Sequence, residues 1–198
     1  MKNINEMPPV GQPESLKAFE ALYQNLLHAN GGFIEYDISY PKVDFLRFLS
    51  KKKNLLIHGS NYDSNELVPK QANCRSKKFG NLNAVYATED GVLPTFYAIR
   101  DKQKFRGVSN SGYSDIKHED GTVEIKYNFE VEPHMLEINP WSEGVVYILP
   151  KAPFEQGTDD EGSLIDEWVS KKSVYPLGKL KIKPEDFPFL KDIKPIKD

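Results

Sequence analysis

The stretch Asn54-Leu-Leu-Ile-His-Gly-Ser60 sets the interpretation of the whole chain. Its apolar residues, Leu55 to Ile57, are typical of a short buried strand that ends at His58 and Gly59. A histidine at a strand end lies where the backbone leaves the core, and a glycine beside it lets a ligand approach the main chain without meeting a Cβ atom. This stretch therefore predicts a ligand-binding edge, with a histidine that serves only the local structure as the alternative.

The composition indicates one globular domain. The chain has 198 residues, of which 39% are hydrophobic and 28% charged, and this is enough for a substantial core. Residues 1–13 are polar and proline-rich, so we expect a flexible lead-in followed by a single domain over residues 14–198. No signal peptide is expected because the first residues contain no apolar segment, and no apolar run approaches the length of a membrane span.

Charge and cysteine content argue against several classes of function. The net charge of −3 and the pI of about 5.9 give no strong signal for nucleic-acid binding. Cys74 is the only cysteine, so no internal disulfide can form and we expect a cytoplasmic protein. His118 and His134 have no partners at metal-ligand spacing, so the sequence predicts no metal site.

Apolar periodicity predicts three helices. The first begins at Ser15, its expected N-cap, and repeats apolar residues at helical spacing until Asn30. The third carries Pro94 in its first turn, where proline is tolerated because the missing N–H has no helical partner there. The second and third predicted helices cover residues 43–49 and 92–100.

Short strands and one long loop account for most of the remaining chain. The loop over residues 60–83 has few apolar residues, and loops of this length are usually functional, so we expect it to border a site. A short helix is predicted over residues 163–170. Helices followed by many short strands indicate an α+β fold with a mainly antiparallel sheet. The predicted strands cover residues 54–58, 83–88, 105–108, 122–131, 144–149 and 174–182.

Two further motifs follow the His-Gly pair. Tyr86 lies in the stretch Ala-Val-Tyr-Ala-Thr, and Tyr97 follows it eleven residues later in the third predicted helix. Glu143 directly precedes the apolar stretch Gly144-Val-Val-Tyr-Ile148. On their own, the two tyrosines are more typical of core aromatics. Glu143 is also compatible with a surface turn, and Glu137 is a rival carboxylate.

The order of these motifs and the spacing of the two tyrosines resemble a known family. Over roughly residues 54–150, the chain resembles ADP-ribosyltransferases of the His-Tyr-Glu class, which include the diphtheria-toxin-like enzymes and the poly(ADP-ribose) polymerases. The resemblance implies N-terminal helices packed on a split, mainly antiparallel β-sheet. It also implies that NAD binds as the substrate and that ADP-ribose is transferred, as a single unit, to an unknown acceptor.

The resemblance further implies a role for each site residue. Glu143, His58 and Tyr86 would be the catalytic set, with the Glu143 carboxylate stabilising the positive charge that develops on the ribose as the nicotinamide–ribose bond breaks. His58 would bond a ribose hydroxyl of NAD, and the backbone of Gly59 would bond the nicotinamide carboxamide. Tyr86 and Tyr97 would stack on the two sides of the nicotinamide ring.

Departures from the family pattern keep two other interpretations open. Pro94 stands where the polymerases have a small hydroxyl residue that holds the carboxamide, and Ser60 or Thr95 is the candidate replacement at the NAD site. The loss of this donor favours a binding module that kept NAD or ADP-ribose binding and lost turnover. An RNA 2'-phosphotransferase of the same fold is the third interpretation, but it needs basic residues that neither residues 54–60 nor the strand of Tyr86 supplies.

Overall fold

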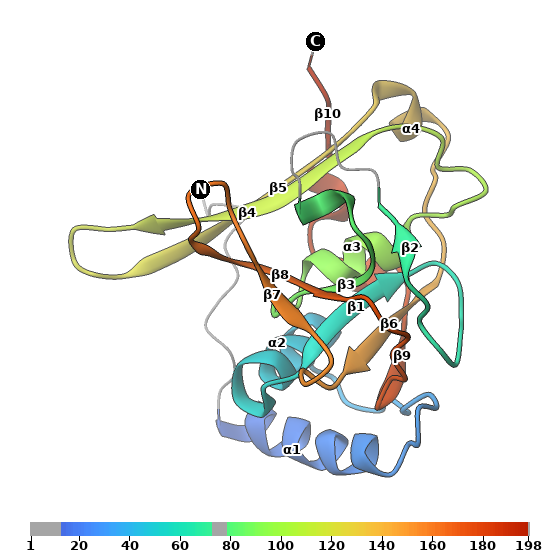
Figure 1. Ribbon diagram of the computed structural model, residues 1–198, viewed down its shortest axis with the longest axis vertical. Coiled ribbons are helices and arrows are strands. Elements are labelled where there is room, and N and C mark those ends of the chain that lie inside the picture. The colour runs from blue at the N-terminus through green and yellow to red at the C-terminus, as the bar shows by residue number, and fades with distance from the viewer. Residues whose placement is uncertain (1–12, 73–78, 198) are drawn as a thin grey trace.

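The computed structural model describes residues 13–72 and 79–197 and has an α+β fold (Figure 1). Cys74, most of the predicted lead-in and part of the predicted long loop lie outside the described residues. No helix among the described residues is long and apolar enough to cross a membrane. The α-helices are α1 (Pro13–Leu27), α2 (Lys42–Lys53), α3 (Leu93–Ile99) and α4 (Pro133–Glu137), and short 3-10 helices cover Phe79–Asn81, Pro184–Asp186 and Leu190–Asp192.

Within residues 13–72 and 79–197 the strands form three sheets, and all strand pairs are antiparallel except β10 on β5. The first sheet has the order β1 (Leu56–Ser60), β6 (Gly144–Leu149), β9 (Gly178–Ile182). The second has the order β2 (Lys70–Gln71), β3 (Asn83–Ala87), β8 (Leu164–Ser170), β7 (Glu155–Thr158). The third has the order β10 (Lys194–Pro195), β5 (Val123–Val131), β4 (Ser109–Lys117), and its β4–β5 hairpin crosses the top of the molecule in Figure 1.

Three local predictions were wrong. The segment predicted as a helix over residues 163–170 is strand β8, because its backbone groups pair with β3 on one side and β7 on the other, and this pairing outweighs helical spacing. No strand forms over residues 105–108; the strand is β4, which starts at Ser109 and is too polar to show an alternating pattern. Ser15 is not an N-cap, since α1 already begins at Pro13.

The β1-β6-β9 sheet separates two hydrophobic cores, because alternate residues of each strand point to opposite faces. The larger core lies on the side of α1, α2 and α3 and also includes β5 and the C-terminal Phe187 and Phe189. The ring of Phe187 packs against Phe96 and Phe129 at centroid distances of 5.6 and 4.8 Å. The smaller core lies on the other face and includes Tyr147 of β6.

Helix α3 lies directly on the backbone of two strands. A Cβ atom on Gly59 of β1 would lie 1.8 Å from the carbonyl oxygen of Pro94, and a Cβ atom on Gly144 of β6 would lie 1.9 Å from the carbonyl oxygen of Ala98. Both distances are far below van der Waals contact, so any side chain at either position displaces the helix. Close packing of α3 is therefore one reason for a glycine at position 59, and it is a reason that the sequence did not suggest.

Among the described residues, one backbone-paired residue pair joins strand β1 of the first sheet to the end of β3 in the second. Ile57 of β1 exchanges both backbone hydrogen bonds with Thr88, at 2.9 and 3.0 Å. Backbone groups two residues apart in a strand point to the same side, so the N–H and C=O of Gly59 also face β3. Within the described residues, no strand pairing covers Gly59 on that side. We call this gap in pairing between β1 and β3, next to Gly59, the split.

Candidate functional site

The five principal residues of the predicted site lie on neighbouring elements. His58 and Gly59 are in β1, Tyr86 is in β3, and Tyr97 is in α3, which packs on β1. Glu143 is the residue immediately before β6, the other neighbour of β1. The predicted site residues thus lie in β1 or in elements next to it. The contacts of each residue show which groups are available to a ligand.

His58 has a defined tautomer. Its Nδ1 lies 2.6 Å from the carbonyl oxygen of Tyr86, and because a carbonyl can only accept, Nδ1 carries the proton. Burial lowers the pKa of His58 from 6.5 to about 4; the bond to Tyr86 opposes this shift, and the nearby cations Lys102 and Lys70 add to it. At neutral pH the ring is therefore neutral, and its Nε2 is an acceptor suited to a hydroxyl group.

The low pKa of His58 predicts a pH-dependent stability. Because the folded-state pKa of about 4 lies below the ordinary 6.5, the contribution of the neutral ring is fully present above pH 6.5 and is lost between pH 6.5 and 4. His58→Asn keeps a donor for Tyr86 but removes the titration. Across this window the parent should lose about 2–3 kcal/mol of unfolding free energy relative to His58→Asn. Urea denaturation of both proteins at pH 7.5 and 4.5 measures this difference, and equal losses would show that His58 titrates normally.

The two tyrosines have different surroundings. The hydroxyl of Tyr86 donates to the carbonyl of Phe79 at 2.9 Å and accepts from the N–H of Leu82 at 2.8 Å, which ties the chain before β3 to the strand. Tyr97 is 38% exposed, and its hydroxyl lies 2.8 Å from the hydroxyl of Ser111 in β4. The guanidinium of Arg100 lies 4.5 Å from the Tyr97 ring centroid. Tyr97 is thus an accessible ring with a cation beside it.

The two candidate replacements for a hydroxyl at Pro94 are now distinguished. The hydroxyl of Thr95 is buried and donates to the carbonyl of Val92 at 2.7 Å, so it is committed to the helix. The hydroxyl oxygen of Ser60 accepts from the N–H of Tyr62 at 3.2 Å and from the Lys102 ammonium at 3.5 Å. Both contacts use Ser60 as an acceptor, which leaves its proton to donate to a ligand.

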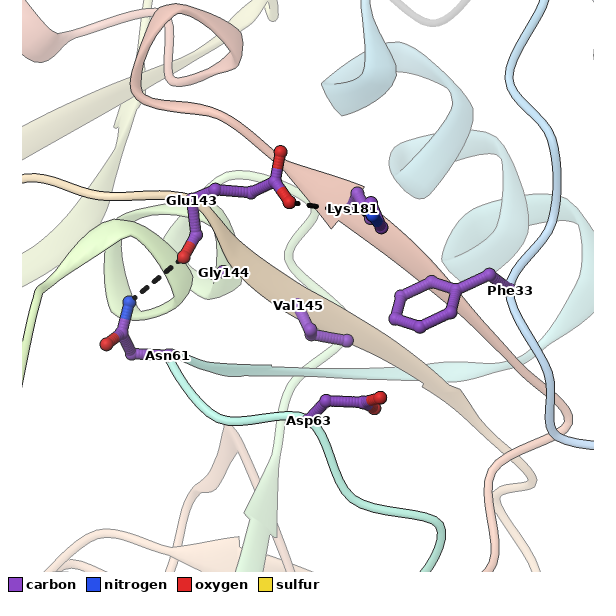
Figure 2. Close-up of a pocket in the computed structure, with 7 residues that line it drawn as sticks. All are labelled: Phe33, Asn61, Asp63, Glu143, Gly144, Val145 and Lys181. Atoms are coloured by element: carbon purple, nitrogen blue, oxygen red, sulfur yellow. Dashed lines mark hydrogen bonds and ion pairs between the residues drawn. The ribbon is translucent and has the colours of Figure 1, made fainter.

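Glu143 is held by its backbone rather than by its carboxylate. The side-chain amide of Asn61, just after β1, lies 3.2 Å from the Glu143 carbonyl and 2.9 Å from the Ser142 hydroxyl, and it also lies 3.2 Å from the Ala98 carbonyl at the end of α3. Figure 2 shows this bond from Asn61 to the Glu143 backbone. Asn61 therefore fixes the start of β6 relative to β1 and α3.

The Glu143 carboxylate points toward Lys181 of β9 (Figure 2), with 3.7 Å between the charged atoms and 48% of the glutamate side chain exposed. It lines a pocket of about 270 Å³ with Phe33 and Asp63, and an adjoining pocket of about 400 Å³ with Phe33 and Tyr36. Neither pocket is lined by His58, Gly59, Tyr86 or Tyr97.

The sheet register relates Glu143 to His58. His58 pairs with Tyr147, with ring centroids 5.9 Å apart, and Glu143 lies four residues before Tyr147 along the same chain. An even number of residues places His58 and Glu143 on the same face of the β1–β6 pair. The structure therefore brings His58 into contact with Tyr86 next to Gly59 and the split. It sets the Glu143 carboxylate further along that face, at the pocket shared with Phe33.

Sequence reasoning missed Asn61 and the cations beside His58. An asparagine after His-Gly-Ser was a signal that could have been followed, since a polar residue at a strand end needs partners. Lys70 and Lys102 gave no such signal, because they lie 12 and 44 residues after His58 and only the fold brings them near it. Among the described residues, no three His, Cys, Asp or Glu side chains are grouped so as to hold a metal ion.

The chain was compared with protein-family models, with curated proteins and with solved structures, and none of the three comparisons finds a match.

Proposed function

We propose that the chain binds NAD at the split and transfers its ADP-ribose group to an acceptor. The observation that supports this most directly is the unpaired edge of Gly59 beside the neutral ring of His58. A carboxamide has one acceptor and one donor group, which match the N–H and C=O of a single residue at an open strand edge. The Nε2 of His58 is then an acceptor for a ribose hydroxyl next to that carboxamide.

The remaining residues fit the same ligand. Tyr97 offers an accessible ring for stacking against nicotinamide. In the transfer step the bond between nicotinamide and the ribose carbon breaks, its electron pair leaves with nicotinamide, and the acceptor forms the new bond and loses a proton. The Glu143 carboxylate stabilises the positive charge that develops on the ribose. The Glu143 side chain is 48% exposed, so an acceptor can approach this carboxylate from solvent.

One observation favours a second candidate, a module that binds NAD or ADP-ribose without turnover. The Glu143 carboxylate is paired with Lys181 and lines pockets that the residues of the split do not line. A catalytic carboxylate has to lie within reach of the reacting carbon, so transfer requires the Glu143 side chain to turn from Lys181 toward the split. Binding at the split requires no such movement.

Calorimetry with nicotinamide and with NAD tests the proposed site. Both ligands should bind, and Tyr97→Leu should weaken the binding of nicotinamide about fivefold, because one aromatic contact contributes roughly 1 kcal/mol. Tyr175→Leu is the matched control, since Tyr175 is 66% exposed and lies in the chain before β9, outside β1, β3 and α3. Its affinities should equal those of the parent.

Chromatography of the same mixtures for free nicotinamide then separates the two candidates. Release of nicotinamide by the parent supports transfer or hydrolysis, whereas binding without release identifies the binding module. Absence of binding by either ligand at millimolar concentration would contradict both.

A further inference from the structure

Two cations, Lys70 and Lys102, lie near His58, and a third, Arg100, lies near Lys102. The Lys102 ammonium, in the loop after α3, lies 3.5 Å from the Ser60 hydroxyl and 4.6 Å from the ring centroid of Tyr62. Burial lowers the pKa of Lys102, and the positive charges of Lys70 in β2 and Arg100 at the end of α3 add to this shift. The positive charges of Lys70 and Lys102 also lower the pKa of His58, after the larger effect of burial.

These cations have no counter-charge in the described part of the chain. None of the salt bridges within residues 13–72 and 79–197 involves Lys70, Arg100 or Lys102. By contrast, Lys104 of the same loop pairs with Asp101 at 3.8 Å. The chain as a whole carries a net charge of −3, so an unpaired group of cations runs against its average composition. Such a group creates a local positive potential that attracts anions.

The guanidinium of Arg100 is already in contact with other side chains, so we expect it to attract a ligand by its charge and not to bind it directly. One of its terminal nitrogens donates to the Ser109 hydroxyl at 2.6 Å, and the guanidinium packs over the Tyr97 and Phe105 rings at 4.5 and 5.2 Å. Its Nε is buried and has no hydrogen-bond partner in the described part of the chain. Lys70 and Lys102, by contrast, are exposed and can reach a ligand.

We propose that Lys70, Lys102 and the Ser60 hydroxyl bind a phosphate group of the ligand, with Arg100 adding to the positive potential. This inference builds on the proposed NAD site, because a dinucleotide whose carboxamide lies on Gly59 carries its pyrophosphate one ribose further on. The same three groups could bind a phosphodiester of a nucleic acid. Residues 54–60 and the strand of Tyr86 contain no basic residue that would have predicted this. Phosphate oxygens accept charge-assisted hydrogen bonds from lysine and a neutral one from serine.

The test compares Lys102→Met with Lys104→Met, two exposed lysines of one loop of which only Lys104 is paired. Binding of ADP-ribose, a short single-stranded oligonucleotide and nicotinamide is measured for each variant and for the parent. Lys102→Met should weaken the binding of a phosphate-bearing ligand roughly tenfold, since it removes one charge-assisted hydrogen bond. It should leave nicotinamide binding unchanged, because nicotinamide carries no phosphate. Lys104→Met should change none of the three.

The two sources of phosphate give different patterns. Weaker binding of ADP-ribose alone assigns the cluster to a nucleotide pyrophosphate. Weaker binding of the oligonucleotide, with a salt dependence reduced by about one counterion, assigns it to a nucleic-acid backbone. Either pattern supports the proposal even where nicotinamide fails to bind, which would count against the proposed NAD site only.

Equal affinities of Lys102→Met and the parent for both phosphate-bearing ligands overturn the proposal. Thermal unfolding provides the second readout. Lys102 forms no salt bridge with the described residues, so Lys102→Met should leave the Tm unchanged. A lower Tm together with unchanged affinities would make Lys102 a structural residue and would also overturn the proposal.

Discussion

Glu143→Gln should reduce nicotinamide release from NAD by about a hundredfold or more while it leaves the affinity for NAD within a few-fold. The substitution keeps the size of the side chain and its backbone contact with Asn61, and it removes only the charge. In the proposed reaction that charge acts on the positive ribose of the transition state and has little to stabilise in bound NAD. The effect should therefore fall on the rate and not on binding.

Glu137→Gln is the matched control for this prediction. Glu137 is the rival carboxylate in the sequence, and in the structure it is exposed at the end of α4, outside the pockets that Glu143 lines. Single-turnover nicotinamide release and calorimetry with NAD are measured for both variants beside the parent. Equal turnover in Glu143→Gln and the parent would remove Glu143 from the mechanism. A loss of equal size in Glu137→Gln would show that the effect is not specific to the Glu143 carboxylate.

Gly59→Ala should lower the free energy of unfolding by about 3 kcal/mol or more, which is the upper range for overpacking a core. The added methyl group would meet the carbonyl oxygen of Pro94 at 1.8 Å. That oxygen belongs to the backbone of α3, so the clash cannot be relieved by turning a side chain, and the whole helix has to move. Gly144→Ala should behave in the same way, since it meets the Ala98 carbonyl oxygen at 1.9 Å.

Gly112→Ala provides the control for both glycine variants. Gly112 lies in β4, and a Cβ atom built there has no neighbour within 4 Å. Its stability should equal or slightly exceed that of the parent, because alanine restricts the unfolded chain. Urea denaturation of the three variants and the parent measures these differences in the free energy of unfolding. A Gly59→Ala protein as stable as the parent would mean that α3 does not rest on the β1 backbone.

Local patterns predicted the elements that carry strong periodicity. The helices α1, α2 and α3 follow from apolar residues at helical spacing, and β1, β3 and β6 follow from short apolar runs. The pattern failed for β8, where Leu164, Ile165 and Trp168 have spacing compatible with a helix but are held by two neighbouring strands. Pairing with distant strands is information that a single segment does not contain.

The sequence predicted the strand that carries the candidate site, but it did not predict which side chains from other segments lie beside it. A short strand ending in His-Gly was enough to expect an exposed edge near His58 and Gly59. The pocket at Glu143 could not be foreseen, because Phe33, Asp63 and Lys181 come from three segments with no shared motif. The group formed by Lys70, Arg100 and Lys102 could not be predicted either, because no local sequence pattern marks any of the three.

Phe187 and Phe189, near the C-terminus, complete the larger hydrophobic core. This has a consequence for folding during synthesis of the chain. Strand β1 has its long partner in β6, about ninety residues later, and the rings on α3 and β5 stay uncovered until Phe187 and Phe189 pack on them. A nascent chain that stops short of residue 189 therefore exposes both an unpaired β1 edge and an aromatic surface. Such contacts between distant residues form slowly. We therefore expect a ribosome-bound chain that ends at β5 to remain non-native, and the native state to form only after residue 189 has emerged.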